Sequence, residues 1–492
     1  MSAGSASGGG TSLNEWITAQ ACFAAQAMLQ AISATHLVMD RPGFGQRVVP
    51  RAGSVLASPV IAHYDPEPDY FFHWFRDSAL VIEALHVALT EGYLGGSAAE
   101  RFAEFVQFSR SLLSLDGREL LRRKNLVAGV QPAFLQYVRP ESELASLAGA
   151  AVLADVRVNA DGTLDFIRWG RPQTDGPALR ALALLRWWQE CPQLDAALRT
   201  DMSELLAADL SFTLAYRHKP AFDIWEERSG YHYYTQLVQA QALSCGAGWL
   251  EQQREHGRAE ICRRAALESL AKLDAFWNEA AGFYDAHATG APGERSGKLD
   301  IAVILAIVRA QRGYGPHSVL DPRAQATLTA LEELFEAEYA INHRRPPERA
   351  AAMGRYAHDR YYSGGAYFFA TLAAAEFYYH LARALGSGAS LPLTPENRRF
   401  RERLGVAAAA DGDSRPAALA MQRGDAIMRT VQAYTPASGE LAEQFDRSTG
   451  APASARHLAW SYAAFITAAA SRAQAGRATP AAGPATPAAG TA

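Results

Sequence analysis

The sequence has few cysteines and little net charge. Only four cysteines occur among 492 residues, at positions 22, 191, 245 and 262, and no two of them have a CxxC spacing. The sequence therefore predicts neither a zinc site nor a disulfide framework. A net charge of −4 is also too small to indicate a nucleic-acid or acidic-lipid partner.

Membrane-spanning and secretory segments are also missing. No stretch reaches the ~18 uncharged apolar residues that a membrane helix needs, because Glu376 and His380 interrupt the most apolar one. Residues 1–11 are rich in Ser, Gly and Ala and lack the basic start and apolar core of a secretory signal. We therefore expect a cytoplasmic protein with no membrane partner. No motif determines the oligomeric state, and a monomer is expected.

No internal linker divides the chain. Length alone would allow about three domains, but residues 12–476 contain no Pro/Gly/Ser-rich segment of the kind that separates domains. We therefore predict a single domain over residues 12–476. Residues 1–11 and the Ala/Pro/Gly-rich residues 477–492 are predicted to be disordered tails.

Helical periodicity dominates what is present. Five segments have charge on one face and are typical of half-exposed helices: 13–32, 98–115, 199–216, 259–277 and 324–340. Strand signals are few. One lies in residues 156–167, where the turn Asn159–Gly162 predicts a hairpin. A calcium loop is a weaker interpretation of that turn, because the ligand spacing and the terminal Glu are absent.

Six other apolar stretches are each preceded by a loop rich in acids and aromatics. The loops are residues 74–77, 169–176, 223–227, 295–298, 355–365 and 443–446, and the stretches begin at Leu80, Ala178, Tyr234, Ile301, Ala366 and Leu458. The stretches at 366–385 and 455–470 are apolar on every face, as in helices that are buried all round. Buried helices that alternate with half-exposed ones predict an all-α fold, an (α/α)6 toroid whose six loops open at one mouth.

Start signals agree with these helices. Pro177 suits the first turn of the helix that follows Asp175-Gly176. Asp77 or Ser78 is predicted to cap the helix near Leu80, and Ser454 is predicted to cap the last helix.

Two of the loops contain carboxylates flanked by aromatic residues. Glycoside hydrolysis needs two carboxyl groups, one to donate a proton and one to activate water or attack directly. Glu226 follows Trp225 in an aromatic-rich loop, and Glu443 precedes Gln444-Phe445. An apolar aromatic setting favours the protonated form that a donor needs. The loops therefore predict a carbohydrate-cleaving pocket.

Structural explanations exist for the same residues. A Trp-Glu-Glu run at a helix start is often only a favourable helix-dipole arrangement. Arg76-Asp77 would also be explained as an ion pair, and Trp74, Trp169 and Trp460 are individually typical of core residues. Their shared position before helices, rather than within them, favours a functional role.

The loops resemble the signature loops of family 15 glycoside hydrolases, the glucoamylases. Residues 70–78, YFFHWFRDS, are similar to the family's YFYTWTRDS, and residues 169–180, WGRPQTDGPALR, differ from WGRPQRDGPALR only at Thr174. DIWEE at 223–227 resembles DLWEE. EQFD at 443–446 and WSYAA at 460–464 resemble EQYD and WSYAA. The resemblance runs in order from about residue 13 to 472.

The resemblance implies roles for these residues. Glu226 would be the general acid and Glu443 the general base of an inverting mechanism. Arg76, Asp77 and Arg355 would hold the terminal glucose, and Glu227 would contact the next sugar. The remaining residues expected at the substrate are Tyr70, Trp74, Trp169, Trp225, Tyr367 and Trp460. An exo-acting release of β-glucose from the non-reducing ends of α-1,4-glucans and malto-oligosaccharides is expected, with no metal and no other cofactor.

Alternatives stay open at this stage. Tyr367 stands where fungal members usually have Trp, so the site for the second sugar is expected to differ. Another α-glucoside, either an α-1,6 dextran-type chain or trehalose, would need the same chemistry. A sugar-binding toroid without catalysis is a different class, and a sugar epimerase of the same fold would be expected to use histidines such as His73 and His232.

Overall fold

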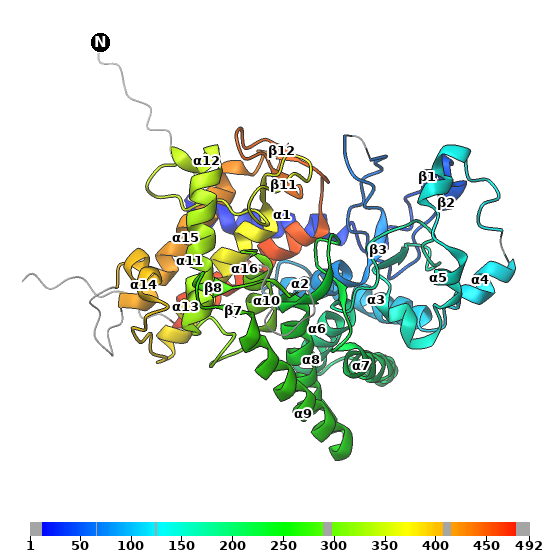
Figure 1. Cartoon of the computed structure of the whole chain (residues 1–492), viewed down its shortest axis with the longest axis horizontal. Helices are drawn as coiled ribbons and strands as arrows, with labels where there is room; N and C mark the ends of the chain where they lie inside the picture. The colour runs from blue at the N-terminus through cyan, green and yellow to red at the C-terminus, as the bar shows by residue number, and fades with distance from the viewer. Residues whose placement is uncertain (1–11, 65, 124, 289–297, 407–414, 479–492) are drawn as a thin grey trace, which may run out of the picture.

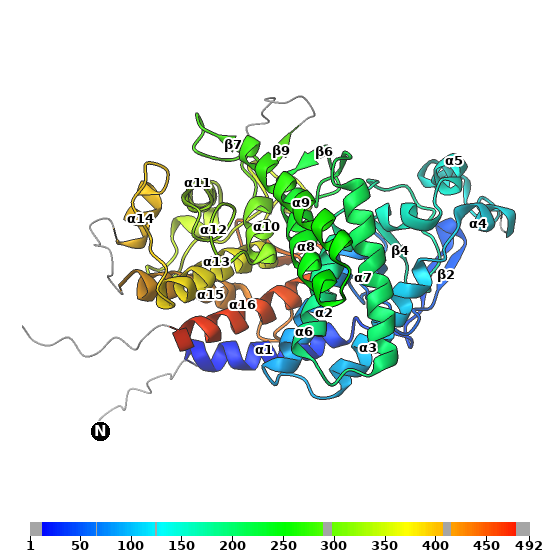
Figure 2. The ribbon, with the colours of Figure 1, turned by 90° about the horizontal axis from the view of Figure 1, so that it is seen from below.

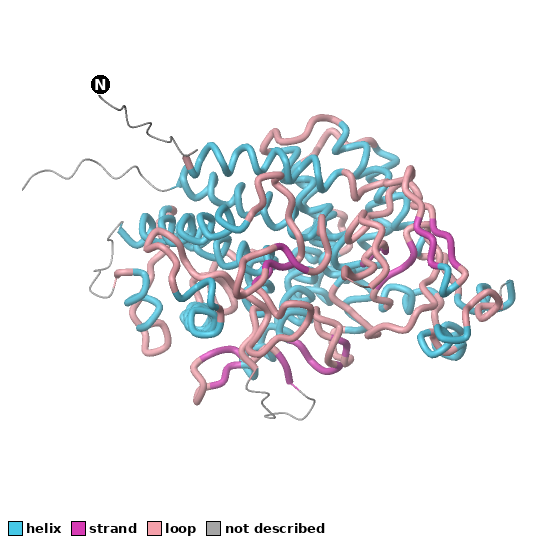
Figure 3. Tube along the Cα trace, turned by 90° about the horizontal axis from the view of Figure 1, so that it is seen from above, coloured by secondary structure: helices cyan, strands magenta, loops and turns pink. Residues whose placement is uncertain are grey.

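The computed structural model describes residues 12–64, 66–123, 125–288, 298–406 and 415–478 (Figure 1). The fold is mostly helical, and the strands are short pieces within loops (Figure 3). The predicted tails, 1–11 and 477–492, lie outside the described residues except for Arg477 and Ala478, which end the last helix. Within the described ranges, no helix combines the length and the apolar character that crossing a membrane requires.

Six helices form a closed inner ring. Each contacts the next in chain order, and the last contacts the first. They are α2 (Phe75–Thr90), α6 (Gly176–Glu190), α8 (Tyr233–Gln252), α10 (Ala302–Ala310), α13 (Phe368–Gly386) and α16 (Ala459–Ala478). Every residue of α10 is buried, as is nearly every residue of α2. All-round burial is what the apolar sequences predict, so the predicted toroid is confirmed.

Six other helices surround this ring. They are α1 (Leu13–Leu29), α3 (Ser97–Leu112), α7 (Ala196–Tyr216), α9 (His256–Leu273), α11 (Pro322–Glu338) and α15 (Arg415–Tyr434). Figure 2 shows α1 lying along α16, which it contacts. Five of the six correspond to the predicted half-exposed segments, whereas α15 was not predicted. Much of its buried face is small, including Gly424, whose position leaves no room for a Cβ against the Tyr379 ring.

Shorter elements complete the chain. The short helices are α4 (Gly117–Arg123), α5 (Glu141–Ala145), α12 (Ala340–His343) and α14 (Arg398–Leu404). The antiparallel strand pairs are β1 (Met39–Arg41) with β2 (Gln46–Val48), β3 (Phe72–Trp74) with β4 (Arg157–Asn159), and β7 (Trp277–Asn278) with β8 (Phe283–Tyr284). Two three-stranded sheets contain β5 (Ala221–Phe222), β6 (Ser229–His232) and β9 (His287–Ala288), and β10 (Ala366–Tyr367), β11 (Gln444–Phe445) and β12 (Pro452–Ala453). The elements β1, β2, α4 and α5 form an extension on the right of Figure 1.

Three inner helices begin directly after a strand, and this corrects the predicted caps. Helix α2 starts at Phe75 with Trp74 at its N-cap, so Asp77 lies inside the first turn and neither it nor Ser78 is the N-cap. The pairing of β3 with β4 fixes Trp74 in an extended conformation and lets the helix begin at once. Ser454 does not cap α16, which starts at Ala459. Pro177 does lie in the first turn of α6, as predicted.

The predicted hairpin is only a small part of what forms around residue 158. Val158 makes an isolated bridge to Leu164, and the Gly162 N–H donates to the Asn159 carbonyl. The main partner of this strand is β3, which lies about 85 residues earlier in the chain. Long-range pairing therefore places Arg157 directly opposite Trp74, a neighbour that local turn signals cannot show.

Candidate active site

One cavity of about 320 Å³ opens at the N-terminal end of the inner ring. Five of the six predicted loops, or the first turns that follow them, supply its walls. In the sixth loop, residues 295–297 lie outside the described residues. Lys298 of this loop lines a smaller hollow adjacent to the cavity. The structure places all the predicted site residues in the cavity wall: Tyr70, Trp74, Arg76, Asp77, Trp169, Trp225, Glu226, Glu227, Arg355, Tyr367, Glu443 and Trp460.

Six other residues line the same cavity and were not predicted as site residues. They are Ala57, Gly170, Ile224, Tyr361, Phe369 and Leu458. Tyr361 has a usable signal, because it is an aromatic residue in the loop that already contains Arg355. Ala57 and Leu458 have none, because a small or aliphatic residue in a loop looks like core.

Glu226 is surrounded by hydrogen-bond donors. Trp74 Nε1 and Arg76 Nη2 donate to its Oε1 at 2.9 and 3.0 Å, and Trp169 Nε1 donates to its Oε2. The aromatic setting predicted for Glu226 came from its own loop, whereas the two indoles that contact it belong to other loops and approach with their N–H edges rather than with apolar faces. These contacts fix the direction in which the carboxyl group points.

The backbone at Glu226 is unusual. Its φ is +64°, a left-handed conformation that non-glycine residues seldom adopt and that is often found at functional sites. The Glu226 N–H donates to the Asp223 carbonyl at 3.0 Å, which closes the turn. A Cβ at Gly170 would lie 2.7 Å from the Glu226 carbonyl oxygen, so only glycine allows the two loops to approach this closely.

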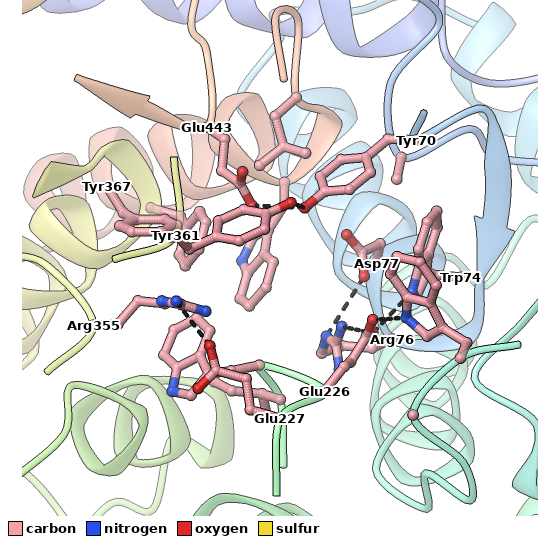
Figure 4. Close-up of a pocket in the computed structure, with 18 residues that line it drawn as sticks. Tyr70, Trp74, Arg76, Asp77, Glu226, Glu227, Arg355, Tyr361, Tyr367 and Glu443 are labelled. Atoms are coloured by element: carbon pink, nitrogen blue, oxygen red, sulfur yellow. Dashed lines mark hydrogen bonds and ion pairs between the residues drawn. The ribbon is translucent and has the colours of Figure 1, made fainter. Parts of the chain in front are cut away.

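Glu443 has a different environment on the opposite side of the pocket (Figure 4). The Ser454 hydroxyl donates to its Oε2, and the Tyr70 hydroxyl lies 3.4 Å from its Oε1. Tyr70 and Tyr361 share a hydrogen bond of 2.7 Å between their hydroxyls. Burial raises the pKa of Glu443 to about 7, although the Ser454 hydrogen bond and the charge of Arg355 lower it.

Arg76 is the charged centre of the pocket floor. Its guanidinium lies 3.0 Å from Glu226 and 3.5 Å from both Asp77 and Asp175, and it donates to Gln173 at 3.1 Å. Burial opposes its charge, but the carboxylates, Asp175 first among them, raise the pKa of Arg76 above its ordinary value. Burial also raises the pKa of Asp77 to about 6 despite the neighbouring Arg76. One cation therefore holds three carboxyl groups together.

Arg355 is the second buried arginine of the cavity wall. Its Nη2 lies 2.9 Å from Glu227 Oε1, and Asp359 accepts from Nε and Nη2 at 2.6 and 2.5 Å. The aromatic rings of Trp225 and Tyr367 lie 5.3 and 5.6 Å from its Cζ. Such a guanidinium, with aromatic faces beside it, suits a polyhydroxylated ring that has both hydroxyls and an apolar face.

Two aromatic residues of the pocket are each held by a specific neighbour. Trp225 Nε1 lies 2.9 Å from Asp300 Oδ2, and burial raises the pKa of Asp300 to about 6. Trp460 stacks on Phe369 with ring centroids 4.0 Å apart and an interplanar angle of 8°. Both rings therefore present a constant surface to the cavity.

The histidines that an epimerase would need do not line this cavity. His73 is fully buried, and its Nδ1 accepts from the Val55 N–H at 2.9 Å. His232 stacks on His287 in the smaller neighbouring hollow. Among the residues that the structure describes, four carboxyl groups and no imidazole line the main cavity.

Comparison with known proteins now decides the family. The model of the family described as "Glycosyl hydrolases family 15" matches residues 26–470. The chain belongs to glycosyl hydrolase family 15. The conclusion does not depend on a short motif, because the match covers nearly all of the ring.

Relatives and solved structures of the family support this membership. The chain is 29% identical over 442 residues to Glucoamylase-1 of Arthroderma benhamiae, covering 86% of this chain and 65% of the relative. It is 31% identical over 479 residues to Glucoamylase P of Amorphotheca resinae, covering 94% and 70%. A solved structure, the Hormoconis resinae glucoamylase, superposes with a TM-score of 0.75 at 28% identity, covering 94% of this chain and 74% of that one. The chain thus spans slightly less than two thirds of the first relative's length.

Proposed function

We propose that this protein is an exo-acting, inverting glycoside hydrolase that releases β-glucose from the non-reducing ends of α-1,4-glucans and malto-oligosaccharides. The observation that carries the proposal is the placement of Glu226 and Glu443 on opposite sides of one pocket (Figure 4). Family 15 membership and the glucoamylase relatives support the same reaction. The buried Arg76 and Asp77 at the pocket floor favour a site that takes the end of a chain.

The proposed roles follow from what each group contacts. Glu226 is the general acid that protonates the glycosidic oxygen, and its direction is set by the Trp74 and Trp169 indoles. Glu443 is the general base that activates water, held by Ser454 and Tyr70. Arg76 and Asp77 hold the hydroxyls of the terminal glucose. An inverting enzyme needs room for water between its two carboxyl groups, a gap of about 6.5–9.5 Å.

The substrate class is tested by glucose release from maltose, isomaltose, trehalose and soluble starch. Maltose and soluble starch are expected to be the best substrates. Preferred hydrolysis of isomaltose or trehalose would replace the α-1,4 assignment with another α-glucoside. No glucose from any of the four would leave a sugar-binding toroid without catalysis.

The stereochemistry of the product tests the mechanism. Water held by Glu443 attacks from the face opposite the Glu226 proton donor, so the anomeric centre inverts. Proton NMR of the first product is expected to show β-glucose before mutarotation. If α-glucose appears first, Glu443 is a nucleophile at about 5–5.5 Å and the inverting proposal is wrong.

The pH dependence of kcat/KM should report Glu443. A base must be ionised, and burial raises the pKa of Glu443 to about 7. Below that pH the group is protonated and inactive, so kcat/KM is expected to fall as pH decreases through about 7. Ser454→Ala removes a hydrogen bond that lowers this pKa, so its acid limb should move to higher pH. A wild-type limb near the ordinary value of 4.5 would contradict this prediction.

We further propose a cytoplasmic location. The four cysteines are all free, as expected in a reducing compartment. Fractionation of the native host would test the location directly, and enrichment in the medium would overturn it.

A further inference from the structure

A four-layer stack of alternating guanidinium groups and aromatic rings stands behind the pocket. Arg41 Cζ and Arg157 Cζ each lie 3.9 Å from the centre of the Phe72 ring. Two guanidinium groups cannot occupy the same face at that distance, so they cover opposite faces. Arg157 Cζ also lies 3.9 Å from the centre of the Trp169 ring. The order of the stack is therefore Arg41, Phe72, Arg157, Trp169.

Arg157 also touches the second tryptophan of the site. It is paired directly opposite Trp74 across the β3–β4 ladder, and its Cζ lies 4.7 Å from that ring. Arg157 is fully buried, and its Nε donates to Asp165 at 2.9 Å. It does not line the cavity and cannot touch the substrate.

The two rings held by Arg157 are the two that hold Glu226. Trp74 Nε1 donates to Oε1 of Glu226, and Trp169 Nε1 donates to Oε2. Any tilt of either indole therefore changes the direction of the carboxyl group. A 1 Å misplacement of a catalytic group can cost about 10²-fold in rate.

We propose that Arg157 is a positioning residue for the acid step, which acts by clamping Trp169 and Trp74 against Glu226. The proposal rests on the proposed hydrolase function and extends it to a residue outside the pocket. A desolvated cation–π contact is stronger than an exposed one, because the positive charge faces the negative ring face in a low dielectric. Arg157 makes three such contacts with the rings of the stack and Trp74.

The test compares Arg157→Gln with Arg41→Gln on two substrates, maltose and α-glucosyl fluoride. Fluoride leaves without a proton, so a defect confined to the acid step should slow maltose and spare the fluoride. Arg157→Gln is expected to lower kcat on maltose about 10-fold and kcat on the fluoride by less than about 3-fold. Asp165 keeps its pair with Arg171 at 2.8 Å, so the variant does not leave that carboxylate alone.

Arg41→Gln is the matched control. Arg41 is equally buried and stacks on the same Phe72 ring, but it lies on the far side from both tryptophans. Any decrease in kcat in Arg41→Gln should be by the same factor on maltose and on α-glucosyl fluoride. Arg157→Lys keeps a cation between the rings and is expected to recover part of the maltose rate.

Near-ultraviolet circular dichroism gives a readout independent of catalysis. The indole bands should change in Arg157→Gln and stay as in the wild-type protein in Arg41→Gln. Equal losses on maltose and the fluoride in Arg157→Gln, or indole bands unchanged from wild type, would overturn the positioning role. If the wild-type protein releases no glucose, the proposed function fails, while the indole bands still test the clamp.

Discussion

Glu226→Gln is expected to lower kcat on maltose by about 10²–10⁴, the usual contribution of a positioned proton donor. The glutamine amide keeps the size of the side chain but cannot protonate the glycosidic oxygen. It also places an NH2 group beside one of the two indole N–H donors, because Trp74 and Trp169 donate to different oxygens of Glu226. Initial rates of glucose release, together with thermal melting to confirm folding, measure the effect.

α-Glucosyl fluoride separates the acid role from any other. The fluoride ion needs no proton to leave, so Glu226→Gln should retain most of the wild-type rate on this substrate. Glu227→Gln is the matched control, because Glu227 is adjacent, lines the same pocket and pairs with Arg355 at 2.9 Å. Glu227→Gln should lose less activity than Glu226→Gln, mainly through a raised KM. Equal losses of Glu226→Gln on maltose and the fluoride would rule out the acid assignment.

Glu443→Gln is expected to lower kcat by about 10²–10⁴ on maltose and on the fluoride alike. Both reactions need an activated water, and the amide cannot accept its proton. Ser454 and Tyr70 donate to different oxygens of Glu443, so the amide oxygen can still accept from one of these hydroxyls while the NH2 group faces the other, which can turn to accept from it. Circular dichroism should therefore show an intact helical fold in an inactive protein.

Azide rescue gives the second half of this test. Azide is an anionic nucleophile that needs no base, so it should restore turnover of α-glucosyl fluoride by Glu443→Ala. The product should be β-glucosyl azide, because attack comes from the side that the water used. Rescue of Glu226→Ala rather than Glu443→Ala by azide would exchange the two roles. The question is open to experiment because the raised pKa of Glu443, about 7, would also suit a proton donor.

The two carboxyl groups are held in contrasting ways. Glu226 accepts from two indoles and a guanidinium, whereas Glu443 accepts from two hydroxyls and is more deeply buried. Differences in burial and donors are the usual means by which two carboxyl groups in one site take different roles. The hydrogen bond from Ser454 to Glu443 was not predicted, because the sequence alone suggested that Ser454 caps a helix.

The sequence by itself determined the helical class, the alternation of buried and half-exposed helices, and the loops that carry the chemistry. These features depend on residues close together in the chain: a stretch that is apolar on every face predicts a buried helix, whichever elements pack against it. The twelve site residues could be named because the loops and first turns that contain them resemble the signature loops of family 15, and the structure places all twelve around one cavity. The helix α15 was not predicted, although its buried residues, such as Ala420, Gly424 and Ile427, recur with helical spacing.

Only the tertiary structure decided how those residues act on one another. Trp169 and Glu226 are 57 residues apart in the chain, and Tyr70 and Glu443 are 373 apart. The burial of Glu443 and its hydrogen bond from Ser454 depend on the closure of the helix ring. The contact of Arg157 with Trp74 depends on the pairing of β3 with β4. Hydrogen bonds, desolvation and cation–π contacts act over a few ångströms of space, so no reading of neighbours along the chain can supply them.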